Sequence, residues 1–69
     1  MVAFSVRQPQ DSSFFRVSMR SNCDFDVSAV CAAFGGGGHH RAAGCSLEAN
    51  GIEDAEKKIL AEIRRLRDA

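Results

Sequence analysis

The chain has 69 residues, which allows one domain close to the lower size limit for folding on a hydrophobic core of its own. Apolar residues make up 45% of the sequence, so its composition excludes a disordered chain. Nine basic and nine acidic residues cancel, which disfavours a protein that coats nucleic acid by bulk charge. Any polyanion must therefore bind at a local cluster.

The N-terminal third predicts two strands joined by a short turn. Apolar residues alternate with small or polar ones over residues 2–7, which is typical of a half-buried strand. Residues 8–13 have turn chemistry, because Pro9 fixes its own backbone angle and the polar residues after it can bond the local backbone. A second alternation over residues 15–20 predicts a second strand, with Arg16 and Arg20 on the face opposite the apolar one.

The next segment is typical of a loop followed by a helix. Residues 21–25 have loop composition, and Asp26 is a good N-cap for a helix over residues 27–34. The apolar residues of that helix recur at helical spacing and form one stripe, and Gly35 suits the position just after its end.

The C-terminal half predicts a short helical turn, a third strand and a long helix. Residues 39–43 have the composition of one helical turn, which Gly44 stops, and a short strand follows over residues 45–48. Asn50 and Glu53 resemble a capping box that opens a helix running to about residue 67. The stripe expected to be buried on this helix consists of Ile52, Ala55, Ile59, Ile63 and Leu66.

These elements predict an α/β fold, in which a small mixed β-sheet carries packed helices in the order β-β-α-(short α)-β-α. Basic residues gather at the end of the last helix, where they complement the helix dipole. A solvated helix end explains them better than a nucleic-acid patch does.

Residues 35–38 are four consecutive glycines between a capped helix and the predicted helical turn at His39, a place that favours a structural task over a flexible linker. Backbone without Cβ atoms can approach a ligand closely, and a helix start at His39 would add free N–H donors and a positive dipole end. The natural ligand is an anion such as phosphate, with a bare turn as the alternative. The loop is not a Walker A motif, because no Lys-Ser/Thr follows it, and it lacks the third glycine of G-x-G-x-x-G.

Three side chains could join the glycine-rich loop at a phosphate. His39 and His40 can donate hydrogen bonds to phosphate oxygens, and Arg20 at the end of its strand suits a bidentate contact. The alternatives are one buried and one solvated histidine, and a solvated arginine at the sheet end. The small residues 42–44 predict close packing of the short helical turn against the sheet.

Two other sites are weaker alternatives. Cys23, Cys31, Cys45 and the two histidines supply zinc-ligand types, but the spacing contains no C-x₂-C and no H-x₃₋₅-H pair. Cys45 with His39 or His40 could also form a nucleophile pair, whereas Cys31 lies on the apolar helix stripe and suits the core.

The cysteines also bear on location. Their number is odd, and no export signal precedes them, which favours a reducing cytoplasm over a disulfide framework. No run is apolar enough to cross a bilayer, so we expect a cytoplasmic protein with no membrane partner.

Several segments together resemble the C-terminal DHH-associated domain of the DHH phosphoesterases. The specific part is the run G-G-G-H-x-x-A-A-G over residues 36–44, together with the Arg-Ser pair at residues 20–21. Residues 17–19 and 26–30 add weaker matches, and the resemblance covers most of the chain from the second strand to the final helix. The subgroup it is most similar to is the oligoribonuclease (nanoRNase) and 3′-phosphoadenosine-5′-phosphate phosphatase type.

The resemblance implies a substrate-binding module that recognises phosphate or nucleotide ends of short oligonucleotides. Its parent would be a hydrolase, a manganese-dependent DHH phosphodiesterase or phosphatase, whose N-terminal DHH domain holds two manganese ions and cuts. By motif match, the residues that contact phosphate are Arg20, Ser21, Gly36, Gly37, Gly38 and His39. His40 and Arg41 occupy variable positions of the motif and are further candidates.

No Asp-His-His motif occurs in the sequence, so we expect no catalytic residue, metal or cofactor in these residues. We expect residues 1–69 to be one domain, the C-terminal fragment of a larger DHH phosphoesterase, with the N-terminal DHH domain as its partner. The alternative function is a small zinc-binding or structural interaction domain.

Overall fold

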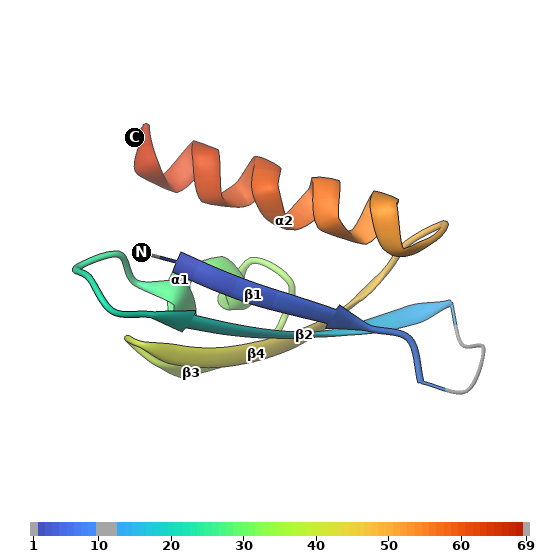
Figure 1. Cartoon of the computed structure of the whole chain (residues 1–69), viewed down its shortest axis with the longest axis horizontal. Coiled ribbons are helices and arrows are strands. Elements are labelled where there is room, and N and C mark those ends of the chain that lie inside the picture. Colours follow the sequence, from blue (N-terminus) through green and yellow to red (C-terminus); the bar gives the residue numbers. More distant parts are fainter. Residues whose placement is uncertain (1, 10–12, 69) are drawn as a thin grey trace.

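The computed structural model describes residues 2–9 and 13–68 and shows a four-stranded sheet with two helices (Figure 1). The elements are β1 (Val2–Arg7), β2 (Phe14–Ser21), α1 (Val27–Ala32), β3 (Gly37–His39), β4 (Ala42–Glu48) and α2 (Ile52–Arg67). The strands lie in the order β1-β2-β4-β3, and each pairs antiparallel with its neighbour. The predicted α/β class, a small sheet with packed helices, is confirmed.

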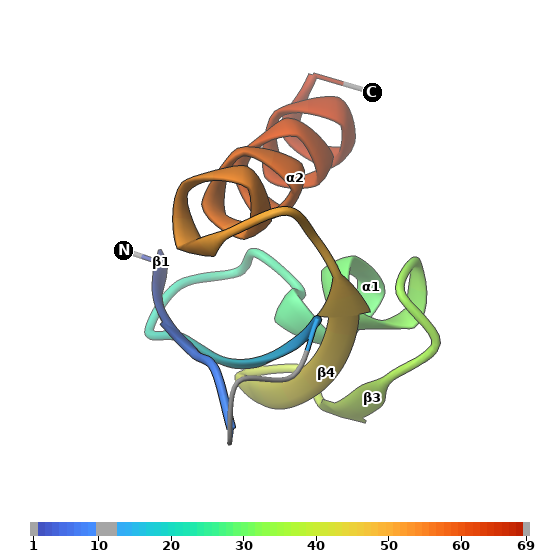
Figure 2. The same ribbon diagram turned by 90° about the vertical axis from the view of Figure 1, so that its right-hand side faces the viewer.

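Both helices pack on one face of the sheet, and Figure 2 shows them on the concave side of its curve. Alternation along β2 buries every second side chain, with Phe15, Val17 and Met19 at the centre of the core. Val27, Val30 and Cys31 of α1 and Ala55 and Ile59 of α2 complete it. The other side chains of β2, including Arg16 and Arg20, are exposed on the opposite face, as the sequence predicts.

The start of α1 follows the prediction, and its end comes earlier. The Asp26 carboxylate accepts a hydrogen bond from the Ser28 N–H at 2.9 Å and caps the helix. The helix ends at Ala32, two residues before the expected Phe34, and a turn follows. Gly35 lies in that turn with φ of 82°, a left-handed conformation that glycine adopts without strain.

The predicted helical turn over residues 39–43 is wrong. β3 and β4 form a hairpin there, closed by a turn at His40 and Arg41. Ala42 to Gly44 pair with β2 on one side and with β3 on the other. The helix preference of alanine, below about 1 kcal/mol per residue, does not outweigh pairing on both edges. Gly44 therefore lies within a strand instead of stopping a helix, and that strand begins at Ala42 instead of Cys45.

The long helix α2 also differs from its prediction at the first turn. Gly51, not Asn50, is the N-cap, and no side chain caps the helix. The Asp54 carboxylate, not that of Glu53, accepts a hydrogen bond from the Asn50 N–H at 3.0 Å.

The buried stripe of α2 is shorter than predicted. Ala55 and Ile59 are buried, and Ile63 and Leu66 pack at the margin of the core. Ile52 is 47% exposed and does not belong to the core cluster. Within the part of the chain that the structure describes, no helix has the length and apolar character needed to cross a membrane.

Candidate functional site

The face of the sheet turned away from the helices carries rows of side chains set by the strand register. We call it the open face; it is formed by Ala3, Ser5, Arg7, Arg16, Ser18, Arg20, Ala42, Gly44 and Ser46 of the three longer strands, continued by β3. Residues paired across antiparallel strands point to the same side of the sheet. Each row therefore runs across all the strands that reach it.

The row at one end of the open face contains Arg20 and His39, two of the side chains that the family resemblance assigns to phosphate binding. Ala3 pairs with Arg20, Arg20 with Ala42, and Ala42 with His39. Neighbouring strands lie about 4.8 Å apart, so the Cα atoms of Arg20 and His39 are separated by about 10 Å. Ala42 between them is too small to fill the gap. The register thus places Arg20 and His39 in one row, on either side of Ala42.

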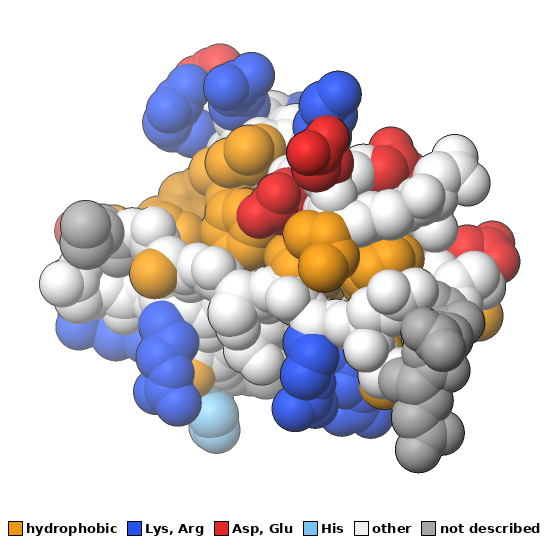
Figure 3. Space-filling model, turned by 45° about the vertical axis from the view of Figure 1, so that its right-hand side comes forward, with side chains coloured by type: hydrophobic (Ala, Val, Ile, Leu, Met, Phe, Trp, Pro, Cys, Tyr) orange, Lys and Arg blue, Asp and Glu red, His pale blue; other side chains and the backbone are white. Residues whose placement is uncertain are grey.

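The cations of this row are available to a ligand. Arg20 and Arg41 line a shallow pocket of about 360 Å³ together with Ala3 and Ala42. Among residues 2–9 and 13–68, no carboxylate forms an ion pair with either guanidinium. Figure 3 shows arginine side chains, with a histidine near them, projecting from the side of the molecule opposite α2; both lysines of the sequence lie on α2 itself.

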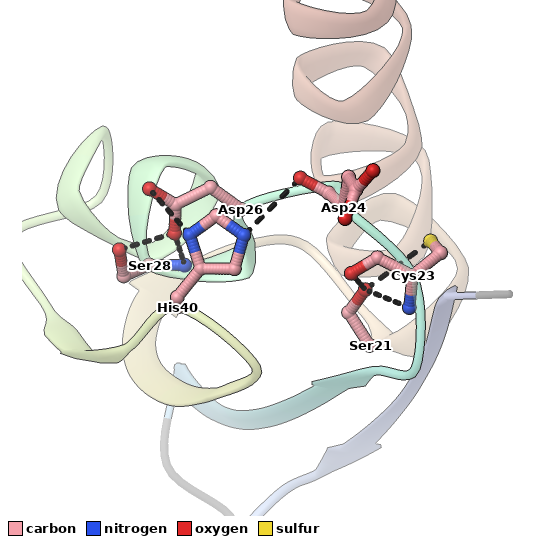
Figure 4. Close-up of polar contacts among 6 residues, drawn as sticks. All are labelled: Ser21, Cys23, Asp24, Asp26, Ser28 and His40. Carbon is pink, nitrogen blue, oxygen red and sulfur yellow. Dashed lines mark hydrogen bonds and ion pairs between the residues drawn. The ribbon is translucent and has the colours of Figure 1, made fainter.

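Ser21 lies in the same strand but faces the other way, and only 7% of it is exposed. Its hydroxyl donates to the Cys23 carbonyl at 3.2 Å and accepts from the Cys23 N–H at 3.3 Å (Figure 4). Its own N–H donates to the Arg41 carbonyl at 2.9 Å. Ser21 therefore fixes the end of β2 and ties it to the β3–β4 turn, which positions Arg20 and Arg41 beside each other.

The glycines of the loop are needed for close packing of backbone. A Cβ at Gly36 would lie 2.3 Å from the Gly44 carbonyl oxygen, and one at Gly38 would lie 2.7 Å from that of Ala42. The Gly36 N–H donates to the Cys31 carbonyl at 2.9 Å, so it is already engaged within the protein. A Cβ at Gly37 would meet nothing within 4 Å.

The donors expected from a helix start at His39 do not exist, because His39 ends the edge strand β3. An edge strand directs alternate N–H and C=O groups away from its neighbour. Backbone donors beside His39 therefore come from the free edge of a strand, and the loop lacks the positive end of a helix dipole.

His40 is turned toward α1 and away from the row of His39. Its Nδ1 lies 3.7 Å from the Asp26 carboxylate, and its Nε2 lies 3.1 Å from the Asp24 carbonyl (Figure 4). Its carbonyl accepts from the Val27 N–H at 3.1 Å. The pKa of Asp26 lies below its usual value, chiefly through the Ser28 hydroxyl and further through His40. His40 fastens the hairpin to the N-terminus of α1, a role that sequence reasoning missed.

The structure does not bring together the residues of the zinc site or of the nucleophile pair between Cys45 and a histidine. Cys31 and Cys45 lie together at the core, where burial raises the pKa of Cys45 to about 12 and also raises that of Cys31. His39 lies on the open face, whereas Cys45 packs against the core on the other side of the sheet, so His39 does not lie beside Cys45 as a base. In the described ranges, no three His, Cys, Asp or Glu residues are grouped to hold a metal ion.

The sequence of the chain matches a known protein family. Residues 1–66 match the family described as the DHHA1 domain, whereas no curated protein matches significantly. Among solved structures, the pGpG-specific phosphodiesterase PggH from Vibrio cholerae superposes with a TM-score of 0.69 at 18% identity. The match covers 97% of this chain and 24% of that one, so the chain spans about a quarter of that protein's length. The likeness confirms the fold, and the sequence match over residues 1–66 shows that the chain belongs to the DHHA1 domain family.

Proposed function

We propose that this chain is the substrate-binding domain of a DHH-type phosphodiesterase and that it holds a phosphate at the end of a short oligonucleotide or nucleotide. The observation that carries the proposal is the row in which Arg20 and His39 lie on either side of Ala42. Membership of the DHHA1 family and the likeness to a phosphodiesterase that acts on pGpG support the class of ligand.

The chemistry of the row fits a phosphate. The Arg20 guanidinium supplies two parallel N–H donors to adjacent phosphate oxygens, and its charge offsets that of the ligand. His39 donates from the opposite side, most strongly when it is protonated. Backbone N–H groups at the free edge of β3 add further donors. Because Ser21 holds the turn that carries Arg41, the site is fixed before the ligand arrives.

The role of the domain in hydrolysis would be to position the substrate. The proposed partner is an N-terminal DHH domain whose aspartate and histidine ligands hold two manganese ions and activate water. Residues of this chain hold the phosphate end in place, which lowers the entropic part of the barrier. The parent enzyme would then be a cytoplasmic oligoribonuclease or related hydrolase.

Amide chemical shifts of the 69-residue chain during titration with adenosine 5′-monophosphate test the proposal. We expect the largest changes at Arg20 and residues 36–39, and we expect Arg20→Ala to weaken binding by about tenfold or more, the effect of losing a charged hydrogen bond. Arg64→Ala is the matched control, because Arg64 is exposed on α2, outside the open face. No movement of residues 36–39 at millimolar ligand, in a folded chain, would refute the proposed function.

A further inference from the structure

The open face carries a pair of arginines four residues along β2 from the row of Arg20. Arg7 of β1 lies directly opposite Arg16 of β2 in the register, and both side chains are exposed. Like charges placed directly opposite each other destabilise a sheet. In residues 2–9 and 13–68, no carboxylate forms an ion pair with either arginine. Their repulsion is therefore not relieved by described carboxylates, and a bound anion would relieve it.

A hollow beside this pair has the composition of a phosphate site. Its volume is about 510 Å³, and polar side chains and one aromatic ring line it together with Val17, Cys45 and three glycines. These lining side chains are Arg7, Arg16, Ser5, Ser18, Ser46 and Phe34. Two guanidinium groups and three hydroxyls can all donate to phosphate oxygens. Phe34 forms an apolar wall, a surface on which a nucleotide base can stack.

The turn after α1 shapes the same hollow. Gly35 and Gly36 line it together with Gly44 of β4, so part of its wall is backbone without side chains. Gly36 is forced to be glycine by its approach to Gly44, which keeps the hollow open at this point. The glycine-rich loop therefore borders both ends of the open face. His39 lies in the row of Arg20, and Gly35 and Gly36 line the hollow beside Arg7 and Arg16.

Only small residues lie between the two ends of the open face. Arg16 and Arg20 are four residues apart in β2, a separation of about 13 Å along the strand. The row between them consists of Ser5, Ser18, Gly44 and Gly37, all of them small. A ligand with a single phosphate can occupy one end of this face only, whereas a longer one can reach both.

We propose that Arg7 and Arg16 form a second phosphate subsite, so that the open face binds a single-stranded oligonucleotide along β2 with one phosphate at Arg20 and His39 and another at the arginine pair. This inference rests on the proposed function and adds a second site on the same face, so that the ligand that fills both sites carries at least two phosphates. Phe34 then contacts the base between or beyond the two phosphates.

A ligand-length series on the 69-residue chain tests the second subsite. The ligands are adenosine 5′-monophosphate and 5′-phosphorylated oligoadenylates of two, three and four nucleotides, with affinity measured at several salt concentrations. We expect affinity to rise at the length that spans both ends. Arg16→Ala should weaken the longer ligands by about tenfold and should weaken the monophosphate much less, because the monophosphate can bind at Arg20 and His39 alone. It should also reduce the salt slope by about 0.7, the value for one phosphate contact in a single strand.

Three companion variants make the outcome decisive. Arg16→Lys keeps the charge and should recover most of the salt slope, whereas Arg20→Ala should weaken every ligand. Arg64→Ala on α2 should weaken none. Because Arg16→Ala removes a repulsive neighbour of Arg7, we expect the fold to persist, which circular dichroism checks.

The failures of the two proposals are distinguishable. Monophosphate binding that depends on Arg20, together with affinity that is independent of length and of Arg16, would overturn the second subsite and leave the proposed function standing. Absence of binding by the monophosphate and by all the oligoadenylates would overturn both.

Discussion

Gly36 and Gly38 lie against the backbone of β4, and this close approach explains why the run contains glycine at these two positions. The sequence indicates a structural task for the glycines, and the structure assigns that task to backbone packing at Gly36 and Gly38. The alternation of β2 also predicts the outward direction of Arg20 correctly. The partners of His40 could not be predicted, because Asp24 and Asp26 approach it only after the hairpin folds against α1.

The glycine run makes a prediction about stability. Gly38 has φ of +149° and would place a Cβ 2.7 Å from the Ala42 carbonyl oxygen, so Gly38→Ala should destabilise the fold by about 1–3 kcal/mol. Gly37→Ala is the matched control, because a Cβ there meets nothing within 4 Å. Urea unfolding of the two variants measures the difference. Equal losses of unfolding free energy would contradict the close approach of β3 to β4.

Cys23 should be the reactive thiol of the chain. Hydrogen bonding, first to the Ser21 hydroxyl and then at the Phe25 backbone, lowers the pKa of Cys23 to about 7. The thiolate is the nucleophile, so alkylation of Cys23 by iodoacetamide should reach half its maximal rate near pH 7. Cys45, with its pKa raised to about 12 by burial, should stay unmodified in the folded chain.

Peptide mapping by mass spectrometry separates the cysteines in that experiment. Ser21→Ala removes the largest cause of the shift and should move the midpoint for Cys23 to higher pH. A midpoint that is the same in the wild-type chain and in Ser21→Ala would show that the hydroxyl does not stabilise the thiolate.

At the scale of elements, the spacing of apolar residues predicts the first hairpin, α1 and α2, but it does not predict the hairpin of β3 and β4. Periodicity detects burial on one face, and β1, β2 and α2 each have such a face. β3 has three residues, all exposed, and two of them are glycine, so it carries no periodic signal. Ala42 and Ala43 favour a helix locally, and only their pairing with β2 and β3 shows that they form a strand.

The difference between the predicted and the observed buried stripe of α2 leads to a prediction about stability. Ile59 is fully buried among β2 and α1 side chains, so Ile59→Ala should destabilise the fold by about 2–5 kcal/mol. Ile52 has the same side chain on the same helix but is 47% exposed, so Ile52→Ala should cost less than about 1 kcal/mol. Thermal and urea unfolding measure both. A large loss at Ile52 would mean that the sequence-based stripe, and not the observed core, is correct.

At the scale of the whole molecule, a net charge of zero conceals a cluster of arginines on one face of the sheet. α2 contains four acidic and five basic residues, and two of the acidic ones, Asp54 and Glu62, pair with basic residues of the same helix. The open face presents Arg7, Arg16 and Arg20 without a described carboxylate partner. Composition gives only the net charge, which is why the sequence could predict a local cluster but not its extent across β1 and β2.

This cluster predicts that the position of a charge affects phosphate binding more than the net charge does. Arg20→Glu and Arg64→Glu change the net charge equally, but Arg20 lies on the open face and Arg64 on α2 across the sheet. A helix and a sheet stack about 10 Å apart, and charges are screened over about 8 Å at physiological ionic strength. Arg20→Glu should therefore abolish measurable binding of adenosine 5′-monophosphate, whereas Arg64→Glu should change it by less than about twofold. Calorimetric titration of both variants measures this, and equal weakening would show that total charge, and not the open face, attracts the phosphate.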